Sequence, residues 1–313
     1  YRSKERLVFS MIDYKTIVEE DWLNSSFLKK NKKLLIIFYL YEQSKNILDY
    51  QITHKKFVNL LSDLSSADML QIKSDWQYIV DKVLSGEAHL LSEAQTSYLS
   101  AATKAKSAQD RRKQPFSDIE AKPRAFSFKS SYLNSLFRNI DQEQDSLFSS
   151  KRTPQTIEEF FDEKFSPFFG KTENEIAVQL NWDCPKPKPK NHRRMLVTRI
   201  LGVRGNKVDG LTKSNTTLKV IKLEKSGALK ESLPFPVFRY TEIVNEDWED
   251  STLFKQLTEN RFVFVIFKER IKGVAPVLEN FMFWHFPMRD IREAEKVWRK
   301  TVSQINKKNA HGL

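Results

Sequence analysis

The chain contains one long segment twice, and this duplication limits its fold more than any other feature does. Residues 4–22, KERLVFSMIDYKTIVEEDW, recur at residues 230–248 as KESLPFPVFRYTEIVNEDW. More than half of the aligned positions are identical, whereas unrelated segments of ordinary composition match at roughly one position in this length. The likeness continues in the apolar runs 34–38 and 262–267. Because solenoid repeats are only about 20–50 residues long, we predict a duplicated domain instead.

A length of 313 residues suits two domains. The polar, aperiodic stretch 141–153 indicates a linker, so we expect one domain in residues 1–150 and another in residues 151–313. Hydrophobic residues make up 40% of the chain, with 23 Phe, which suffices for a core in each half. The chain opens in mid-pattern at Tyr1 with no initiator Met or signal peptide, so we expect a fragment of a longer protein.

Composition excludes several classes of protein. The single cysteine, Cys184, rules out a disulfide framework and a cysteine-based zinc site, and it fits a reducing compartment such as the bacterial cytoplasm. No apolar run approaches the roughly 18 residues that a membrane span needs, so we expect no membrane partner. GxGxxG, Walker A, HExxH and GxSxG motifs are absent, and the five His are not at ligand spacing. A nucleotide-binding, zinc-protease or serine-hydrolase site is therefore not expected.

Hydrophobic periodicity predicts a mixture of helices and strands. We expect strands at residues 7–11, 34–39 and 216–223, the last of the edge type. We expect helices at residues 67–84, 154–169 and 289–305, with Gly86 as a C-terminal cap and one helical turn at residues 17–22. Residues 195–201 suit either a helix end or a strand. Residues 184–194, CPKPKPKNHRR, are expected to form an extended basic loop, because alternating prolines remove backbone donors.

The net charge of +12 suggests a polyanionic partner, since Lys and Arg that neutralise phosphates release condensed counterions. A well-solvated basic surface would have the same composition. Residues 97–137 interleave small residues, hydroxyls and cations with aromatics, a mixture that can contact phosphates and base edges. An ordinary surface strand followed by a helix would also fit that segment.

Several segments together resemble the MutH-type mismatch-repair nicking endonucleases, and more closely their two-repeat relatives, type II restriction endonucleases that cut at GATC. Residues 169–177 (FGKTENEIA) resemble the family's GxTLGELA-like opening helix, and residues 194–202 (RMLVTRILG) its GxLLExxLG helix. Residues 74–84 (SDWQYIVDKVL) resemble its EDWEELMDxI helix. The resemblance covers most of the chain. It implies a PD-(D/E)xK nuclease fold, an α/β (α+β) arrangement with a mixed sheet flanked by helices.

In that family two acidic residues bind Mg²⁺, and a Lys assists the attacking water. Here the ExK motif of the second repeat aligns with Thr217-Leu218-Lys219, so Thr replaces Glu. The expected Asp falls on Gly210, with Asp209 one step away, and the helix Glu falls on Thr198. The resemblance therefore implies an inactive second repeat that binds no metal. The first repeat's carboxylates would precede Tyr1, and Mg²⁺ would act only in the full-length enzyme.

The resemblance also implies where DNA is read. Residues 97–104 and 124–136 match a recognition strand, and a strand with the helix that follows it. Lys104 would contact the GATC site beside Thr103, Lys129 would contact backbone or base edge, and Arg124 and Ser127 lie in the same matching segment. Ser127 stands where the family has a Tyr near the target adenine.

Three hypotheses follow. The first is that the chain is part of a GATC-specific restriction endonuclease, in which the inactive repeat binds a second GATC copy and stabilises the active repeat. This hypothesis is compatible with a dimer, or with a DNA loop between two GATC sites. The second is a duplicated DNA-binding module without catalysis. The third is a structural protein whose charge is incidental, which salt-independent or absent DNA binding would favour.

Overall fold

The computed structural model describes residues 7–41, 46–107, 109–138, 154–183, 188–203, 209–229 and 237–307. Its strands are β1 Leu7–Met11, β2 Lys33–Tyr39, β3 Ile52–Asn59, β4 Leu99–Thr103, β5 Arg112–Gln114, β6 Ser117–Ala121, β7 Arg124–Phe128, β8 Thr216–Leu223, β9 Arg261–Lys268 and β10 Val277–Trp284. Its helices are α1 Ser26–Asn31, α2 Ser66–Leu84, α3 Ser130–Arg138, α4 Ile157–Phe165, α5 Glu173–Gln179, α6 His192–Ile200, α7 Asp209–Lys213, α8 Tyr240–Ile243, α9 Thr252–Glu259 and α10 Met288–Asn306. The predicted linker 141–153 lies outside the described residues.

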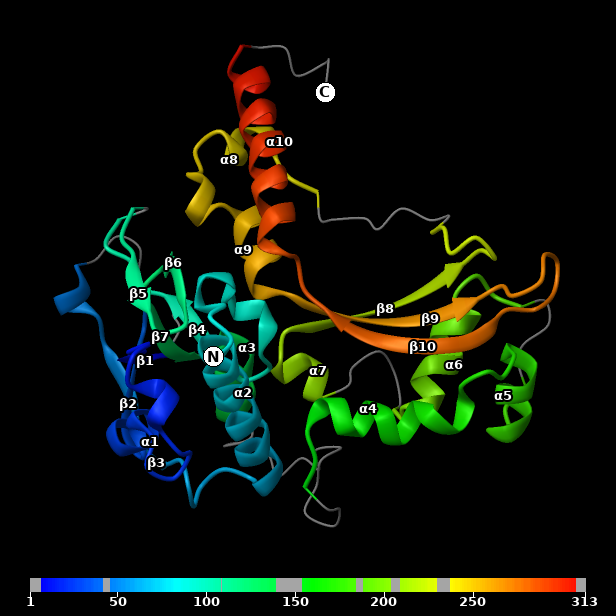
Figure 1. The fold of residues 1–313 in the computed structure, drawn as a ribbon, viewed down its shortest axis with the longest axis horizontal. Coiled ribbons are helices and arrows are strands. Elements are labelled where there is room, and N and C mark those ends of the chain that lie inside the picture. The colour runs from blue at the N-terminus through cyan, green and yellow to red at the C-terminus, as the bar shows by residue number, and fades with distance from the viewer. Residues whose placement is uncertain are drawn as a thin grey trace.

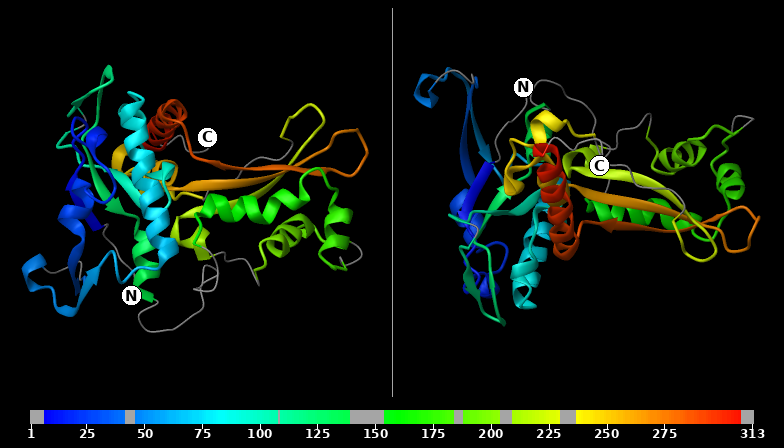
Figure 2. Two further views of the ribbon diagram at one scale, coloured as in Figure 1. Left: turned by 60° about the horizontal axis from the view of Figure 1, so that its bottom comes forward. Right: turned by 90° about the horizontal axis from the view of Figure 1, so that it is seen from above.

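Most elements form two lobes that lie side by side, and α8, α9 and α10 project away from both (Figure 1). One lobe holds the three-stranded sheet β1-β7-β4, the β2-β3 and β5-β6 hairpins, and α2. The other holds the sheet β10-β9-β8, with α4, α5 and α6 on one side of it, as the two further views also show (Figure 2). In this second sheet β8 runs parallel to β9 and β10 runs antiparallel to it. The predicted mixed sheet flanked by helices is confirmed.

The two faces of the β8-β9-β10 sheet differ. On β9, Val263, Val265 and Phe267 are fully buried, and on β10 the rings of Phe281 and Phe283 pack against Phe161 of α4 at 5.5 and 5.2 Å. This alternation follows the two-residue period of a strand. The opposite face carries the stacked rings of Phe262 and Phe264, which pair in register with Thr217 and Lys219 of β8. Thr217 and Lys219 therefore lie on the face turned away from α4.

Both copies of the repeated sequence fold alike at their centre. Trp22 packs on Trp76 with ring centroids 5.6 Å apart at 59°, and Trp248 packs on Trp298 at 5.6 Å and 53°. A serine stands three residues after the first Trp of each pair and caps the helix that follows, α1 or α9. The repeated sequence thus specifies the same local structure twice, as the duplication predicts.

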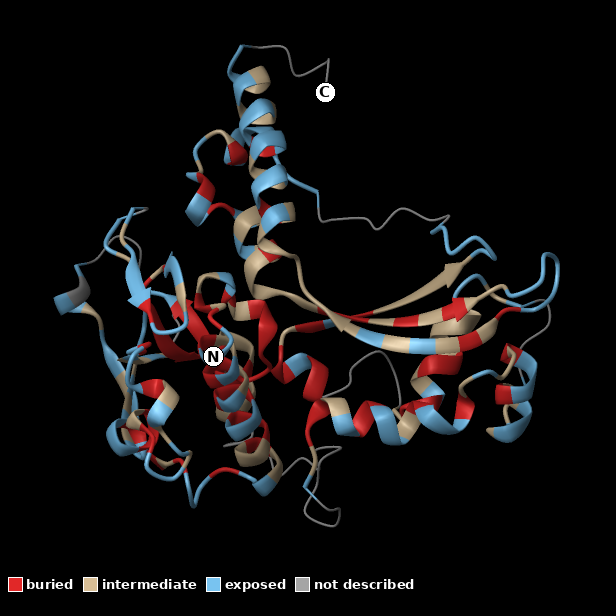
Figure 3. Cartoon of the chain, viewed as in Figure 1, coloured by how far each residue is buried: buried red, intermediate tan, exposed pale blue. Residues whose placement is uncertain are grey.

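The hydrophobic core does not stop at the predicted boundary between residues 150 and 151. One cluster of buried side chains runs from Ile12 to Leu278 and takes in α2, β4, β7, α4, α6 and the β8-β9-β10 sheet. Figure 3 shows the buried residues concentrated where the two lobes meet. A separate small cluster holds the buried residues of α8 to α10, namely Ile243, Trp248, Leu257, Ile291 and Trp298. The division at 150/151 remains a prediction about sequence units.

Most predicted elements are confirmed, and three differ. Residues 192–194 of the predicted basic loop begin helix α6, because the last proline is Pro189 and nothing after it prevents a helix. Residues 184–187 lie outside the described part of the chain. Residues 17–22 form only a single 3₁₀ turn, Ile17–Glu19. The hairpin β5-β6 inside residues 97–137 was not predicted, since its strands are short and polar.

Gly86 closes α2 as predicted. Its φ of +69° lies in the left-handed region, its N–H donates to Val83 O at 3.0 Å, and Glu87 N–H donates to Lys82 O at 2.8 Å. This is the hydrogen-bond pattern of a Schellman cap. A Cβ at this position would lie 2.4 Å from Phe116 O in the turn of the β5-β6 hairpin. Gly86 therefore allows both the helix end and the close approach of the hairpin.

Candidate DNA interface and the altered catalytic position

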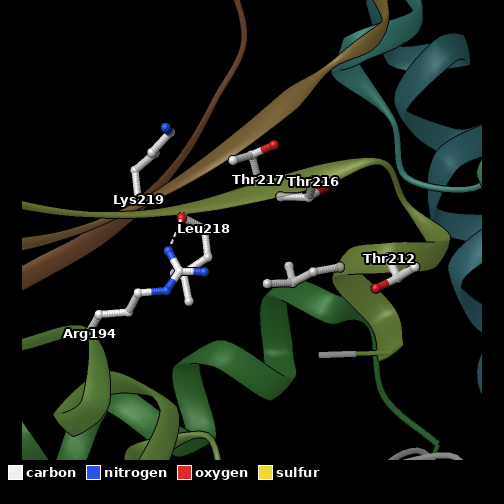
Figure 4. A pocket seen from close by; sticks show the side chains of 7 residues that line it. Arg194, Thr212, Thr216, Thr217, Leu218 and Lys219 are labelled. Carbon is white, nitrogen blue, oxygen red and sulfur yellow. Dashed lines mark hydrogen bonds between the residues drawn. The ribbon is translucent and has the colours of Figure 1, made fainter. Parts of the chain in front are cut away.

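The open edge of β8 carries a pocket of about 270 Å³. Its lining residues come from α6, α7 and β8, and they are Arg194, Leu211, Thr212, Thr216, Thr217, Leu218 and Lys219. Thr217 and Lys219 project from one face of β8, while the guanidinium of Arg194 reaches the strand from the other face (Figure 4). Cations and hydroxyls dominate the polar lining, and no carboxylate is among the described residues that line the pocket.

The two cations of this pocket differ from their neighbours in having no acidic partner among the described residues. Arg194 Nη1 donates to the backbone oxygen of Leu218 at 3.3 Å and forms no ion pair there. The next residue on α6, Arg193, pairs with Glu173. On the same strand as Lys219, Lys222 pairs with Glu269 at 3.1 Å. The positive charge at the pocket is therefore left uncompensated by the described part of the protein.

Helix α6 is held in place by one buried carboxylate on α5. Thr172 caps α5, and Glu173 in its first turn accepts from His192 Nε2 at 2.7 Å and from Arg193 Nε at 2.5 Å. Burial would raise the pKa of Glu173, but the bonds from His192 and Arg193 outweigh it and the pKa is lowered. The charged carboxylate thus fixes the first turn of α6, from which Arg194 reaches β8.

Of the other positions in the predicted cluster, Thr198 and Gly210 are not among the residues that line the pocket. Thr198 lies on α6 one turn after Arg194, and its hydroxyl donates to Met195 O at 2.9 Å. Asp209 and Gly210 begin α7, and Gly210 is buried. The structure therefore brings together Thr217 and Lys219 from the predicted cluster and adds Arg194, which sequence reasoning missed. Its position directly after another cationic residue, Arg193, concealed its separate role.

Of the predicted DNA-contacting residues, Thr103 and Lys104 lie at the surface. Thr103 ends β4, and both side chains are exposed. The Lys104 N–H donates to Pro123 O at 2.9 Å, which fixes the backbone where the strand ends. Exposed cations and hydroxyls of this kind are able to reach phosphates or base edges. A DNA contact through these two residues remains a prediction.

Arg124, Ser127 and Lys129 are buried, with exposures of 7%, 0% and 6%. The Arg124 guanidinium donates to the backbone oxygens of Ala101, at 2.9 Å, and Leu91. Burial lowers the pKa of Arg124. Ser127 donates to Phe128 O at 3.3 Å. In this structure none of the three side chains is available to DNA, so contact would require them to leave these positions.

Lys129 instead joins the two lobes. Its Nζ donates to Thr96 O at 2.5 Å and to Ser214 O at 3.3 Å, and burial lowers its pKa to about 8. Nearby, Lys213 of α7 pairs with Asp68 of α2 at 3.2 Å. Asp68 lies on the same side of α2 as its apolar residues, where a polar side chain needs a bonding partner. That position was the sequence signal for this junction.

A second group of polar contacts crosses the same junction. Arg261 at the start of β9 donates to Glu158 of α4 at 2.6 Å and to Ser97 Oγ at 2.9 Å. The backbone N–H of Ile157 donates to Gln71 Oε1 at 2.9 Å. Ile157 and Gln71 are buried, so breaking their bond would leave a buried polar atom unsatisfied, and the bond favours one relative placement of the lobes.

Comparison with known proteins decides the family. The family described as DNA mismatch repair enzyme MutH matches residues 1–75 and 205–298, more than half of the chain. The chain belongs to the MutH family. It is also 32% identical over 342 residues to the type II restriction enzyme Sau3AI of Staphylococcus aureus, with 97% of this chain and 65% of that enzyme aligned. The chain thus spans less than two thirds of that relative.

The two stretches that match the MutH family contain the two copies of the repeat, in residues 4–22 and 230–248. The resemblance stated from sequence is therefore confirmed. No helix among the described residues is long and apolar enough to cross a membrane.

The residues at the pocket do not fit a divalent metal ion. Mg²⁺ requires carboxylate or other oxygen ligands that offset its charge, whereas this pocket presents Arg194 and Lys219. Among the described residues no group of three or more His, Cys, Asp or Glu could hold a metal. Metal chemistry of the MutH family has no support from the side chains at this position.

Proposed function

We propose that this chain is part of a type II restriction endonuclease that recognises 5′-GATC-3′ in double-stranded DNA. Its second half acts as a non-catalytic, allosteric DNA-binding domain, and hydrolysis with Mg²⁺ takes place in the first repeat. The observation that carries the proposal is the pocket at β8, which Thr217 and Lys219 line with no carboxylate among the described lining residues. We take β8 to correspond to the family's catalytic strand. Membership of the MutH family and the likeness to a restriction enzyme supply the reaction class.

The first repeat offers a place for a catalytic strand. β2 pairs only with β3 in the described part of the chain, whereas β9, its counterpart, pairs with β10 on one edge and with β8 on the other. Leu35 and Ile37 of β2 and Phe57 of β3 are 51%, 50% and 73% exposed. We propose that a strand bearing the metal-binding carboxylates pairs with β2 as β8 pairs with β9.

The test is binding of the 313-residue chain to a short GATC duplex and to a scrambled duplex at two salt concentrations, with Mg²⁺ or with a chelator. The expected result is preferential, salt-dependent binding of GATC without cleavage. Equal binding of both duplexes would contradict sequence recognition. Cleavage by this chain would contradict the assignment of Thr198, Gly210 and Thr217 to the altered catalytic positions.

The missing carboxylates also favour a second candidate, a DNA-binding protein with no catalytic role. The two are separated with the complete protein on DNA carrying one or two GATC sites. Faster cleavage of two-site DNA is expected if the second half binds a second site and loops the DNA or dimerises. Equal rates on both substrates would exclude the allosteric role, and absence of cleavage would favour the second candidate. Either function would place the protein with DNA in the bacterial cytoplasm.

A further inference from the structure

The pocket at the edge of β8 retains a definite chemistry although it does not suit a metal. Its charged groups are the guanidinium of Arg194 and the ammonium of Lys219. Three threonines, Thr212, Thr216 and Thr217, also line it, and the Thr216 hydroxyl is hydrogen-bonded to Ser214 Oγ at 2.7 Å. Guanidinium and ammonium groups only donate hydrogen bonds, and threonine hydroxyls donate as well as accept. A ligand that accepts many hydrogen bonds and carries negative charge complements such a set.

The charges at the pocket are available for a ligand. Elsewhere on the same elements a cation faces a carboxylate, as Arg193 faces Glu173 and Lys222 faces Glu269. Arg194 and Lys219 have no such partner among the described residues, and only one N–H of Arg194 is engaged, by Leu218 O. Two uncompensated cations beside one concave site attract an anion by simple electrostatics.

The shape of the pocket suits a ligand with several linked phosphates better than a single enclosed ion. β8 is the outer strand of its sheet, so the pocket wraps around an open edge. Lys219 rises from one face of the strand and Arg194 approaches from the other, so the two cations flank that edge (Figure 4). Lys219 shares its sheet face with the rings of Phe262 and Phe264, opposite the face packed on α4.

We infer that the β8 pocket binds phosphodiester groups of a DNA strand directly through Arg194 and Lys219, without a metal ion. The inference deepens the proposed function and rests on it, because DNA is taken as the source of the phosphate. Charge-assisted bonds from Arg and Lys would take the place of the metal–phosphate contacts for which the family's carboxylates serve. The second half would thereby hold DNA at a position where it cannot cut it.

The experiment measures binding of a GATC duplex to the 313-residue chain by fluorescence anisotropy in EDTA and again in Mg²⁺. Arg194→Gln and Lys219→Gln are each expected to raise Kd about tenfold and to reduce the salt dependence by about one phosphate contact. The loss is expected to be equal in EDTA and in Mg²⁺. Lys222→Gln, paired with Glu269, and Arg199→Gln, which lies over the Trp182 ring, serve as charge-matched controls. Both are expected to stay within about twofold of the unchanged chain.

Unchanged binding by both pocket variants would overturn the inference, and so would equal losses in the controls or binding that disappears in EDTA. Thermal unfolding checks that each variant is folded. If Arg194→Gln is not, Lys219→Gln decides, because the Lys219 side chain makes no hydrogen bond or ion pair among the described residues.

Failure of the proposed function is distinguishable from failure of the pocket. If the unchanged chain binds no DNA, the proposed function is wrong, and titration with inorganic phosphate at constant ionic strength then tests the pocket alone. If phosphate raises the melting temperature and both pocket variants abolish the rise, the pocket is an anion site whose ligand is not DNA. No rise, or the same rise in the variants, would overturn the anion site as well.

Discussion

Helices α2 and α10 are the same element of the repeat, yet different surroundings give them different roles. Asp75, directly before Trp76 on α2, is buried and accepts backbone N–H groups from Ser97, Tyr98 and Leu99. The residue directly before Trp298 on α10 is Val297, which is 67% exposed. The strand β4, which begins at Leu99, covers α2, whereas no described strand covers α10 in this way. The repeated sequence therefore specifies the helix, and the segment that follows decides which face is buried.

The two copies differ again in their strands. β9 is paired on both edges, and its inward side chains Val263, Val265 and Phe267 are fully buried. β2 is paired only with β3 among the described residues, and its inward side chains Leu34 and Ile36 pack on the core but are only partly buried. On its other face Leu35 and Ile37 are half exposed. An unpaired apolar strand edge is a site for strand addition. The second copy has a three-stranded sheet, and the first copy has the corresponding hairpin with no third strand among the described residues.

The largest predicted effect tests this contrast between strands. Val265→Asp on β9 is expected to destabilise the chain by about 4 kcal/mol or more, because it places an unpaired carboxylate in the core. Ile37→Asp on β2 is expected to cost about 1 kcal/mol or less, since half of that side chain is already in water. Urea unfolding of both variants measures the difference.

A cost of Ile37→Asp as large as that of Val265→Asp would show that β2 is covered in this chain. In a longer protein that adds a strand to β2, the cost of Ile37→Asp is expected to rise, because side chains of the neighbouring strand would cover part of Ile37. That rise would support the proposed position of the catalytic strand.

The next effect concerns pH and the contact between Asp75 of α2 and the start of β4, which has no counterpart at α10 among the described residues. Burial raises the pKa of Asp75 from 3.8 to about 6, against the opposing bonds from Ser97, Tyr98 and Leu99. Between about pH 4 and 6 the folded chain therefore holds a proton that the unfolded chain has released, so stability falls as pH rises through this window, by on the order of 2–3 kcal/mol. Asp75→Asn is expected to remove this slope.

Lys129 gives the complementary alkaline effect. Burial lowers its pKa from 10.5 to about 8, so between these values the unfolded chain holds the extra proton and stability rises with pH. Lys129→Met is expected to abolish that rise. Urea midpoints at a series of pH values measure both windows, and Lys222→Met serves as a control for an ion-paired surface cation. If the urea midpoint of the unchanged chain does not vary with pH in either window, burial does not shift the pKa of Asp75 and Lys129 as described.

Sequence alone predicts most of this fold for a physical reason. Strands such as β1 and β8 and helices such as α2 and α10 follow from local periodicity, and Gly86 follows from its place after a periodic run. The junction between the lobes does not follow in the same way. The DNA contact of Lys129 is implied by the resemblance to the MutH family and stays a prediction, whereas the carbonyls of Thr96 and Ser214 that it meets are brought together only by the fold.

The candidate site was partly predictable for the same reason. Thr217 and Lys219 sit at alternate positions of one predicted strand, so their common face follows from sequence. Arg194 lies on a different element, and its approach to Leu218 depends on how α6 packs beneath β8. Charge that is left uncompensated is likewise a property of three-dimensional neighbours. A sequence cannot show it.

The smallest predicted effect tests where the copies are most alike. Ser25 Oγ accepts from Leu28 N–H at 3.2 Å and donates to Trp22 O at 2.8 Å, and Ser251 Oγ does the same with Phe254 N–H at 3.1 Å and Trp248 O at 2.7 Å. Both serines are fully buried. Each substitution by Ala is expected to cost about 1 kcal/mol through loss of the helix cap, measured by urea unfolding.

Equal costs for Ser25→Ala and Ser251→Ala would mean that the capped turn contributes the same amount in the large core as in the small cluster around Trp298. The double variant is expected to lose the sum of both within about 0.5 kcal/mol, because the two caps share no partner. Ser226→Ala, in an exposed turn, controls for loss of a surface hydroxyl. If only Ser25→Ala lowers the stability, the small cluster around Trp298 unfolds separately from the main core. The two copies would then share a local structure but not the same unfolding transition.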